Sequence, residues 1–111
     1  MKTNPSSVQS DKAFDLATSL LYQPGAVVSR TFADQKSGTI TLFAFAAGQG
    51  LSEHTAPFDA FVLILEGRME ITIDGKGRTV EKGQALIMPA GHPHALSAPV
   101  DSKMLLVMIR E

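Results

Sequence analysis

The sequence has no cysteine and no tryptophan, only one tyrosine, and few aromatic residues of any kind (6%). Without cysteine the chain can form no disulfide, and it offers no thiolate to a metal ion. Chains without disulfides are typical of the reducing cytoplasm, so we expect a cytoplasmic protein. The first ten residues are polar, and they lack the apolar central region of a secretory signal.

Long hydrophobic runs and clusters of one charge are also missing. The longest apolar runs are six residues, at 42–47, 60–65 and 104–109, whereas a membrane-spanning helix needs about 20. Ten Lys and Arg residues stand against eleven Asp and Glu residues, which gives a formal net charge of −1. No basic cluster occurs that would attract a phosphate backbone or an anionic lipid surface. We therefore expect no nucleic-acid partner and no membrane partner.

The remaining composition is that of one globular domain. The chain has 111 residues, 44% of them apolar and 19% charged, which suffices for a single core. From residue 26 on, apolar or alternating stretches are separated by turn signals about every eight to twelve residues, which predicts an all-β barrel or sandwich. Asp74-Gly75 is expected to form a two-residue hairpin turn of type I′. The expected strands are 26–33, 39–46, 60–65, 68–73, 76–81, 84–88, 94–98 and 103–109.

The chain divides at about residue 25. Residues 1–25 are expected to form a partly disordered N-terminal segment, because the first ten residues are polar. Within that segment, the apolar spacing over residues 12–21 allows a short helix with Asp11 as its N-cap. Residues 26–111 are expected to form the β-barrel domain.

Two of the expected strands, 60–65 and 103–109, are apolar on both faces. A strand of this kind is buried on both sides. A sandwich of this length has one interior, so the second face is most simply covered by another subunit. We therefore predict a homodimer.

All three histidines lie in two stretches rich in glycine and proline. His54 lies in the stretch 48–67, and His92 and His94 lie in the stretch 83–94. In each stretch a turn meets an expected strand beside the histidine. Imidazole nitrogens bind protons, metals or ligands near neutral pH, so these residues are the candidates for the functional site.

The two stretches resemble the paired motifs of the cupin superfamily. The positions that follow the family spacing are Gly48, His54 and Gly67 in the first motif and Gly83, Pro89, Gly91 and His94 in the second. The resemblance covers residues 38–109 and implies a small single-domain cupin with a jelly-roll barrel, also called a double-stranded β-helix. It does not fix an activity, because one fold can carry many functions.

The first motif departs from the metal-binding pattern of the family. The second histidine of that pattern falls at Ala56 and its glutamate falls at Ala60, and alanine has no donor atom. His54 and His94 remain, with His92 as a further candidate whose direction the sequence leaves open. The resemblance therefore implies a degenerate site that would hold a divalent ion such as Zn, Ni, Mn or Fe only weakly.

Alternation along a strand predicts which side chains share the interior. Residues 54 and 56 lie on one face, and Ala60 and Val62 on the next strand should also point inward. We predict that His54 and His94 face each other across the barrel, with Ala56 and Ala60 lining the space between them.

Three interpretations of the histidines stay open. They are buried polar residues bonded to the backbone or water; or His54 and His94, with or without His92, form a weak metal site; or the interior binds a small organic ligand. The third is favoured, because Ala56 and Ala60 leave apolar walls around polar anchors. Its pocket residues are His54, Ala56, Ala60, Val62 and His94. The corresponding function is ligand binding by a sensor or accessory protein, and the alternative is a metal-dependent oxygenase, isomerase or decarboxylase.

Overall fold

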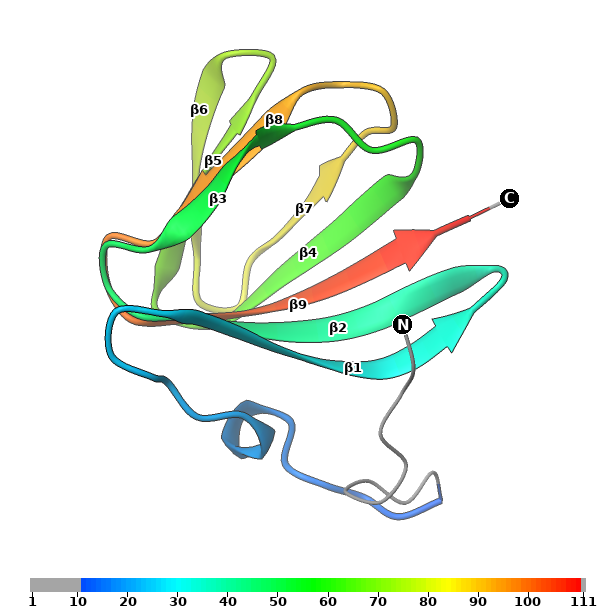
Figure 1. The fold of residues 1–111 in the computed structure, drawn as a ribbon, viewed down its shortest axis with the longest axis vertical. Helices are drawn as coiled ribbons and strands as arrows, with labels where there is room; N and C mark the ends of the chain where they lie inside the picture. The colour runs from blue at the N-terminus through cyan, green and yellow to red at the C-terminus, as the bar shows by residue number, and fades with distance from the viewer. Residues whose placement is uncertain (1–10, 111) are drawn as a thin grey trace.

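Two antiparallel β-sheets face each other in the computed structural model, which describes residues 11–110 (Figure 1). One sheet has five strands in the order β1-β2-β9-β4-β7, and the other has four in the order β3-β8-β5-β6. The strands are β1 (Val27–Gln35), β2 (Gly38–Phe45), β3 (Gly50–His54), β4 (Asp59–Glu66), β5 (Arg68–Ile73), β6 (Lys76–Glu81), β7 (Ala85–Met88), β8 (His94–Ser97) and β9 (Ser102–Ile109). The predicted all-β jelly-roll class is confirmed.

The core lies between the two sheets, where one side chain in two points inward along each strand. On β4, Ala60, Val62 and Ile64 are buried in the core, whereas Phe61 points outward and is partly exposed. Met69 and Ile71 on β5 close the core from the opposite sheet and have no exposed surface. The period of two in the sequence thus decides which residues form the interior.

The hairpin predicted at Asp74-Gly75 joins β5 to β6. Both residues have positive φ, 53° and 77°, as a type I′ turn requires. Gly67, between β4 and β5, also has positive φ, at 73°. At Gly67 a side chain would in addition collide with the backbone oxygen of Asp101.

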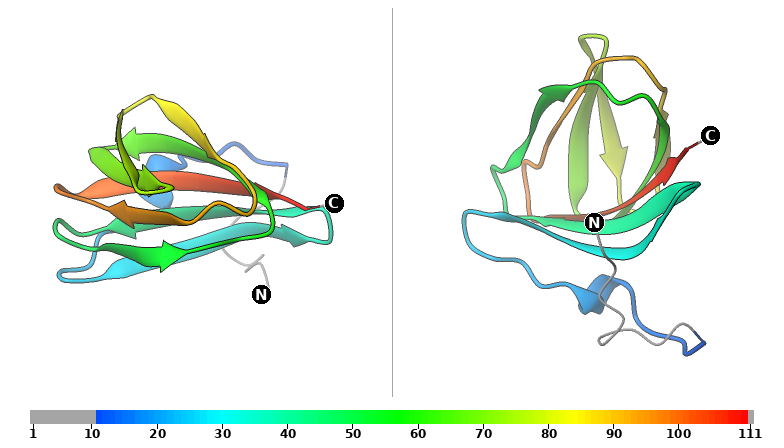
Figure 2. Two further views of the ribbon diagram at one scale, coloured as in Figure 1. Left: turned by 90° about the horizontal axis from the view of Figure 1, so that it is seen from above. Right: turned by 45° about the vertical axis from the view of Figure 1, so that its right-hand side comes forward.

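The N-terminal segment runs across the outer face of the five-stranded sheet, on the side of β1 and β2 away from the other sheet (Figure 2). Its regular structure among residues 11–24 is one turn of 3-10 helix, η1 (Ala17–Ser19). Leu16, not the expected Asp11, is its N-cap, and no side chain caps it. The predicted disorder of residues 1–10 concerns residues outside the described part of the chain. None of the helical segments in residues 11–110 is long and apolar enough to cross a membrane.

Polar contacts hold this segment to the sheet. The ammonium group of Lys103, a buried residue of β9, donates to the backbone oxygen of Ala17 at 2.6 Å. The Tyr22 hydroxyl donates to Glu66 at 2.8 Å, and burial, followed by the effect of Glu66, raises the pKa of that hydroxyl. Arg30 donates to the backbone oxygen of Ser19 at 2.8 Å. One end of the outer sheet face is thus covered by the chain itself.

Substitution by alanine should lower the free energy of unfolding by different amounts at the two turn glycines. Gly75→Ala should lower the free energy of unfolding by about 1 kcal/mol, because it only forces a positive φ on alanine. Gly67→Ala should lower it by about 3 kcal/mol or more, since the new methyl group also meets the Asp101 backbone. Urea unfolding of both variants measures the difference, and equal losses would show that the backbone at Gly67 has room for a side chain.

Candidate functional site

A small cavity of about 50 Å³ lies between the sheets. It is lined from both sheets by Leu51, His54, Ala56, Ala60, Met88, His94, Leu96, Met104, Leu106 and Met108. Eight of these residues are apolar and two are histidines. The wall is thus hydrophobic except where the imidazole rings meet it.

The two histidines form a directly contacting pair. His54 ends β3 and His94 begins β8, and the two residues are cross-strand partners in the four-stranded sheet. Their Nε2 atoms are 3.1 Å apart, and the rings meet edge to face at an interplanar angle of 74°. The predicted placement across the barrel is therefore wrong, because strand pairing makes the two residues neighbours on one wall.

Backbone carbonyls orient both rings. His54 Nδ1 lies 2.8 Å from the Ser52 oxygen, and His94 Nδ1 lies 3.2 Å from the His92 oxygen. A carbonyl oxygen only accepts, so a proton on each Nδ1 satisfies both contacts. The two Nε2 lone pairs then converge, and they suit a shared proton, a metal ion or a donor group on a ligand.

Burial affects the two rings unequally. His94 is 4% exposed, and that burial, followed by the positive charge that His54 can carry, lowers the pKa of His94 below its ordinary value of 6.5. The contact with the His92 carbonyl opposes the shift. The site therefore favours a neutral His94 at neutral pH.

The other predicted site residues take different places. Ala56 and Ala60 line the cavity beside the histidines. Val62 is fully buried in the hydrophobic core and is absent from the cavity wall. His92 points elsewhere: its Nδ1 atom lies 2.7 Å from Asp74 in the β5–β6 turn, and about half of its side chain is exposed. The contact with Asp74 gives His92 a partner outside the cavity.

The donor set matches a resident metal ion only in part. Imidazole nitrogens bound to one ion at about 2.05 Å lie roughly 2.9 Å apart at 90° and roughly 3.3 Å apart at the tetrahedral angle, and the observed Nε2 separation of 3.1 Å falls between these values. A third donor is missing, because residues 11–110 contain no group of three or more His, Cys, Asp or Glu side chains placed to hold an ion. The residues present therefore do not form a complete metal site.

Sequence reasoning did not assign the methionines to the site. Met88, Met104 and Met108 line the cavity, although a methionine on a strand, read from the sequence alone, is most simply a flexible filler of the core. The strand register contains the missing signal. Ala60 is the register partner of Met88 on β7 and of Met108 on β9. Ala60, Met88 and Met108 therefore share the inward face.

The family model for the cupin domain matches residues 41–110. Among solved structures, a conserved protein of unknown function from Streptococcus pyogenes is 38% identical with a TM-score of 0.90, over 100% of this chain and 96% of that chain. A cupin superfamily protein from Desulfitobacterium hafniense is 28% identical with a TM-score of 0.88, over 95% and 96% of the two chains.

A curated relative, polyketide synthase CurC of Streptomyces cyaneus, is 31% identical over 72 residues. The match covers 64% of this chain and 47% of the relative. The chain thus spans about half the length of the curated relative that it matches.

The lowered pKa of His94 predicts that acid destabilises the fold. In the unfolded chain His94 regains its ordinary pKa of 6.5, so below that pH the unfolded state binds the proton first. The stability due to neutral His94 should be complete above pH 6.5 and lost as the pH falls toward the lower folded-state pKa. Urea unfolding from pH 5 to pH 8 should show a weaker pH dependence for His94→Gln, and parallel curves for the two proteins would contradict the assignment.

Completing the donor set should create a tight metal site. The double substitution Ala56→His and Ala60→Glu places two further donors on the lining of the cavity that His54 and His94 already line. Zinc titration followed by calorimetry should show weak binding by the natural protein and roughly 100-fold tighter binding by the variant. Ala47→His, on an exposed residue, is the control that adds a histidine elsewhere. Equally tight binding by the natural protein would show that other residues complete the site.

Proposed function

Because this chain belongs to the cupin domain family, we propose that it is a small cupin whose barrel binds a small organic ligand, as a sensor or accessory protein. The observation that carries the proposal is the apolar cavity with two converging imidazole nitrogens on one wall. Apolar walls with a few placed polar groups are the usual composition of a ligand site.

The two alanines favour an organic ligand over a bound ion. Ala56 and Ala60 line the cavity without offering a donor atom or a charge. An ion held by two imidazoles alone would need further ligands from solvent, in a space whose remaining walls are hydrocarbon and thioether groups. An organic molecule can instead place its apolar body against those walls and one hydrogen-bonding group against the Nε2 atoms.

The volume limits the size of the ligand. An apolar cavity of about 150 Å³ holds a benzene molecule, whereas this cavity measures about 50 Å³. With the side chains as they stand, the ligand is smaller than an aromatic ring, such as a short-chain acid or alcohol. Rotation of Met88, Met104 or Met108, whose side chains have three flexible bonds, would enlarge the space.

The second candidate is a metal-dependent cupin enzyme, such as an oxygenase, isomerase or decarboxylase. The Nε2 separation of 3.1 Å favours it, because it suits two neighbouring positions around one ion. That function requires donors which residues 11–110 do not bring together, so a substrate would have to supply them. Metal analysis of the purified protein separates the two candidates.

Location and further partners belong to the same proposal. The support for a cytoplasmic protein is the cysteine-free sequence. The support for a protein without nucleic-acid or membrane partners is the net charge of −1.

Filling the cavity should abolish ligand binding. Ala60→Leu adds three carbons to a side chain that lines the cavity and is 2% exposed. Amide NMR spectra of the natural protein, recorded with millimolar propionate, butyrate, butanol and phenol, should show shifts at cavity residues for at least one compound. These shifts should vanish in Ala60→Leu and persist in Ala47→Leu, whose substitution lies on an exposed residue. A natural protein that responds to none of the compounds, or a filled cavity that still responds, would refute the proposal.

A further inference from the structure

One buried hydroxyl group near the cavity has no hydrogen-bond partner. Thr39 on β2 is 7% exposed, and none of residues 11–110 forms a hydrogen bond with its Oγ1 atom. Two other buried polar atoms in this part of the chain, Arg30 Nη2 and Arg110 Nε, also lack a partner, but both guanidinium groups donate through Nη1. A buried hydroxyl without any partner is costly and calls for an explanation.

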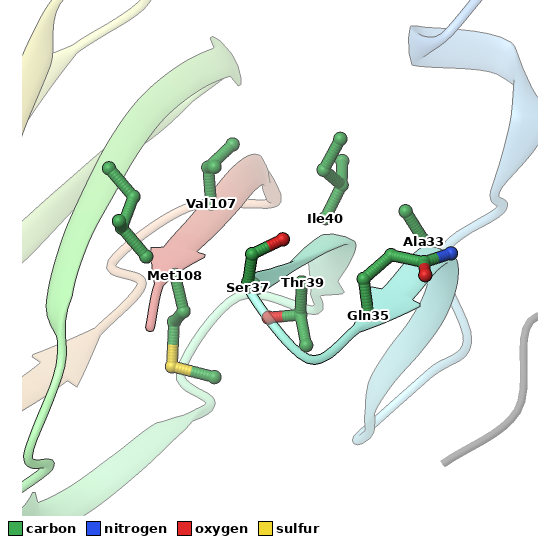
Figure 3. Close-up of a pocket in the computed structure, with 9 residues that line it drawn as sticks. Ala33, Gln35, Ser37, Thr39, Ile40, Val107 and Met108 are labelled. Atoms are coloured by element: carbon green, nitrogen blue, oxygen red, sulfur yellow. The ribbon is translucent and has the colours of Figure 1, made fainter. Parts of the chain in front are cut away.

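Strand register places this hydroxyl beside the cavity wall. The β9 residues that line the cavity have register partners on β2, which are Phe43 for Met104, Thr41 for Leu106 and Thr39 for Met108. Directly opposed residues of two antiparallel strands share one face, with Cβ atoms about 4.5–5.5 Å apart. Figure 3 shows Thr39 and Met108 pointing to the same side of the sheet, away from Ile40 and Val107. Thr39 therefore lies one strand beyond the cavity wall, next to Met108.

Thr41 lies on the same face but its hydroxyl is already used. Its Oγ1 atom is 3.2 Å from Oγ1 of Thr31, so the two hydroxyl groups bond to each other. Thr41 is about as buried as Thr39, at 8% exposed. The difference between the two threonines is the hydrogen bond and not the burial, which makes Thr41 a matched control for Thr39.

The Met108 side chain stands between the cavity and Thr39, and it can move. As it stands, the cavity measures about 50 Å³, less than the roughly 150 Å³ that holds a benzene molecule. A methionine side chain is unbranched and has three rotatable bonds. A rotation of Met108 away from the histidine pair would extend the cavity toward β2, where Thr39 is the neighbouring residue.

We propose that Thr39 is a second hydrogen-bonding residue of the ligand site, which the ligand reaches when the Met108 side chain turns aside. The ligand is then a short chain with a polar group at each end, such as a diol or a hydroxy acid. One end bonds to the Nε2 atoms of His54 and His94, and the other bonds to Thr39, whose hydroxyl both donates and accepts. The inference rests on the proposed binding of a small organic ligand and specifies the second polar group of that ligand.

Ligands of matched size test the second polar group. In 1,3-propanediol a hydroxyl replaces the terminal methyl group of butanol, and 1,4-butanediol is related to pentanol in the same way. Amide NMR titrations give the dissociation constant of each compound. Thr39→Val keeps the shape of the side chain without its hydroxyl, and it should weaken the binding of at least one diol by roughly 3- to 10-fold. The same variant should leave both mono-alcohols unaffected, and Thr41→Val should leave all four compounds unaffected.

The melting temperature of the ligand-free protein tests the missing partner. Thr39→Val removes a buried hydroxyl that has no partner, so the melting temperature should stay the same or rise. Thr41→Val removes the hydrogen bond to Thr31 and should lower the melting temperature. A threonine with a purely structural role at position 39 would instead lose stability as Thr41 does.

Methionine methyl signals test the movement of Met108. In protein labelled with carbon-13 at the methionine methyl groups, the signal of Met108 is assigned from its loss in Met108→Leu. The diol should shift this signal. The signal of Met69 should stay in place, because Met69 lies in the core and is not among the residues that line the cavity.

The outcomes separate this inference from the proposed function. If the mono-alcohols bind but the diols bind equally well to the natural protein and to Thr39→Val, the ligand does not reach Thr39 and the inference fails alone. It also fails alone if Thr41→Val weakens the diols as much, if Thr39→Val lowers the melting temperature as Thr41→Val does, or if the diol leaves the Met108 signal in place. If none of the four compounds binds, the ligand site itself is refuted and the inference falls with it.

Discussion

The alternation of side chains across the β-strands is the constraint on which both the cavity and the outer face depend. On β4, Ala60 lines the cavity while its neighbour Phe61 lies on the outer face. On β9, Met108 points into the cavity and Val107 points outward. A slip of one residue in register would exchange these faces. In a strand that is apolar on both faces, the opposite sheet covers the inner face. The outer face then needs a second cover from outside the barrel.

The histidine pair owes its geometry to the backbone. Antiparallel pairing of β3 with β8 makes His54 and His94 neighbours, and the carbonyls of Ser52 and His92 fix how the rings turn. Within residues 11–110 the hydrogen bonds of the two rings go to carbonyls and to each other, and none goes to a carboxylate that would stabilise two positive charges. This agrees with the lowered pKa of His94, whose causes are burial and the neighbouring imidazole. Two polar atoms converge in an otherwise apolar space, which gives a ligand a defined orientation without the charge that a complete metal site would add.

Local patterns predicted most of the fold, because each strand carries its own period and each turn its own chemistry. The strands β5 (68–73) and β6 (76–81) match their expected ranges, and the hairpin at Asp74-Gly75 adopts the positive φ values that its residues favour. Long-range choices could not be read in the same way. The pairing of β3 with β8 could not be predicted from the sequence, and this pairing places His54 and His94 side by side on one wall of the cavity. The contact of His92 with Asp74, eighteen residues away, could not be predicted either, because it depends on how two loops pack against each other. The strand register, once known, explains the methionines on the cavity wall.

The N-terminal segment covers part of the outer sheet face, a cover that the prediction of a homodimer from strands with two apolar faces did not include. Near the start of β9 the chain's own N-terminal segment lies on the outer sheet face, held by the buried Lys103 and by Tyr22. Burying an ammonium group is costly unless it is paired and hydrogen-bonded, and here the Ala17 carbonyl, the Tyr22 ring and Glu66 surround it. This polar anchor sets where the self-covered part of the face ends. Beyond it the sheet continues with Leu105, Val107 and Ile109, which alternate with the cavity residues Leu106 and Met108. Substitutions on the outer face and in the cavity therefore share one strand, and their effects on stability should not be assumed to add.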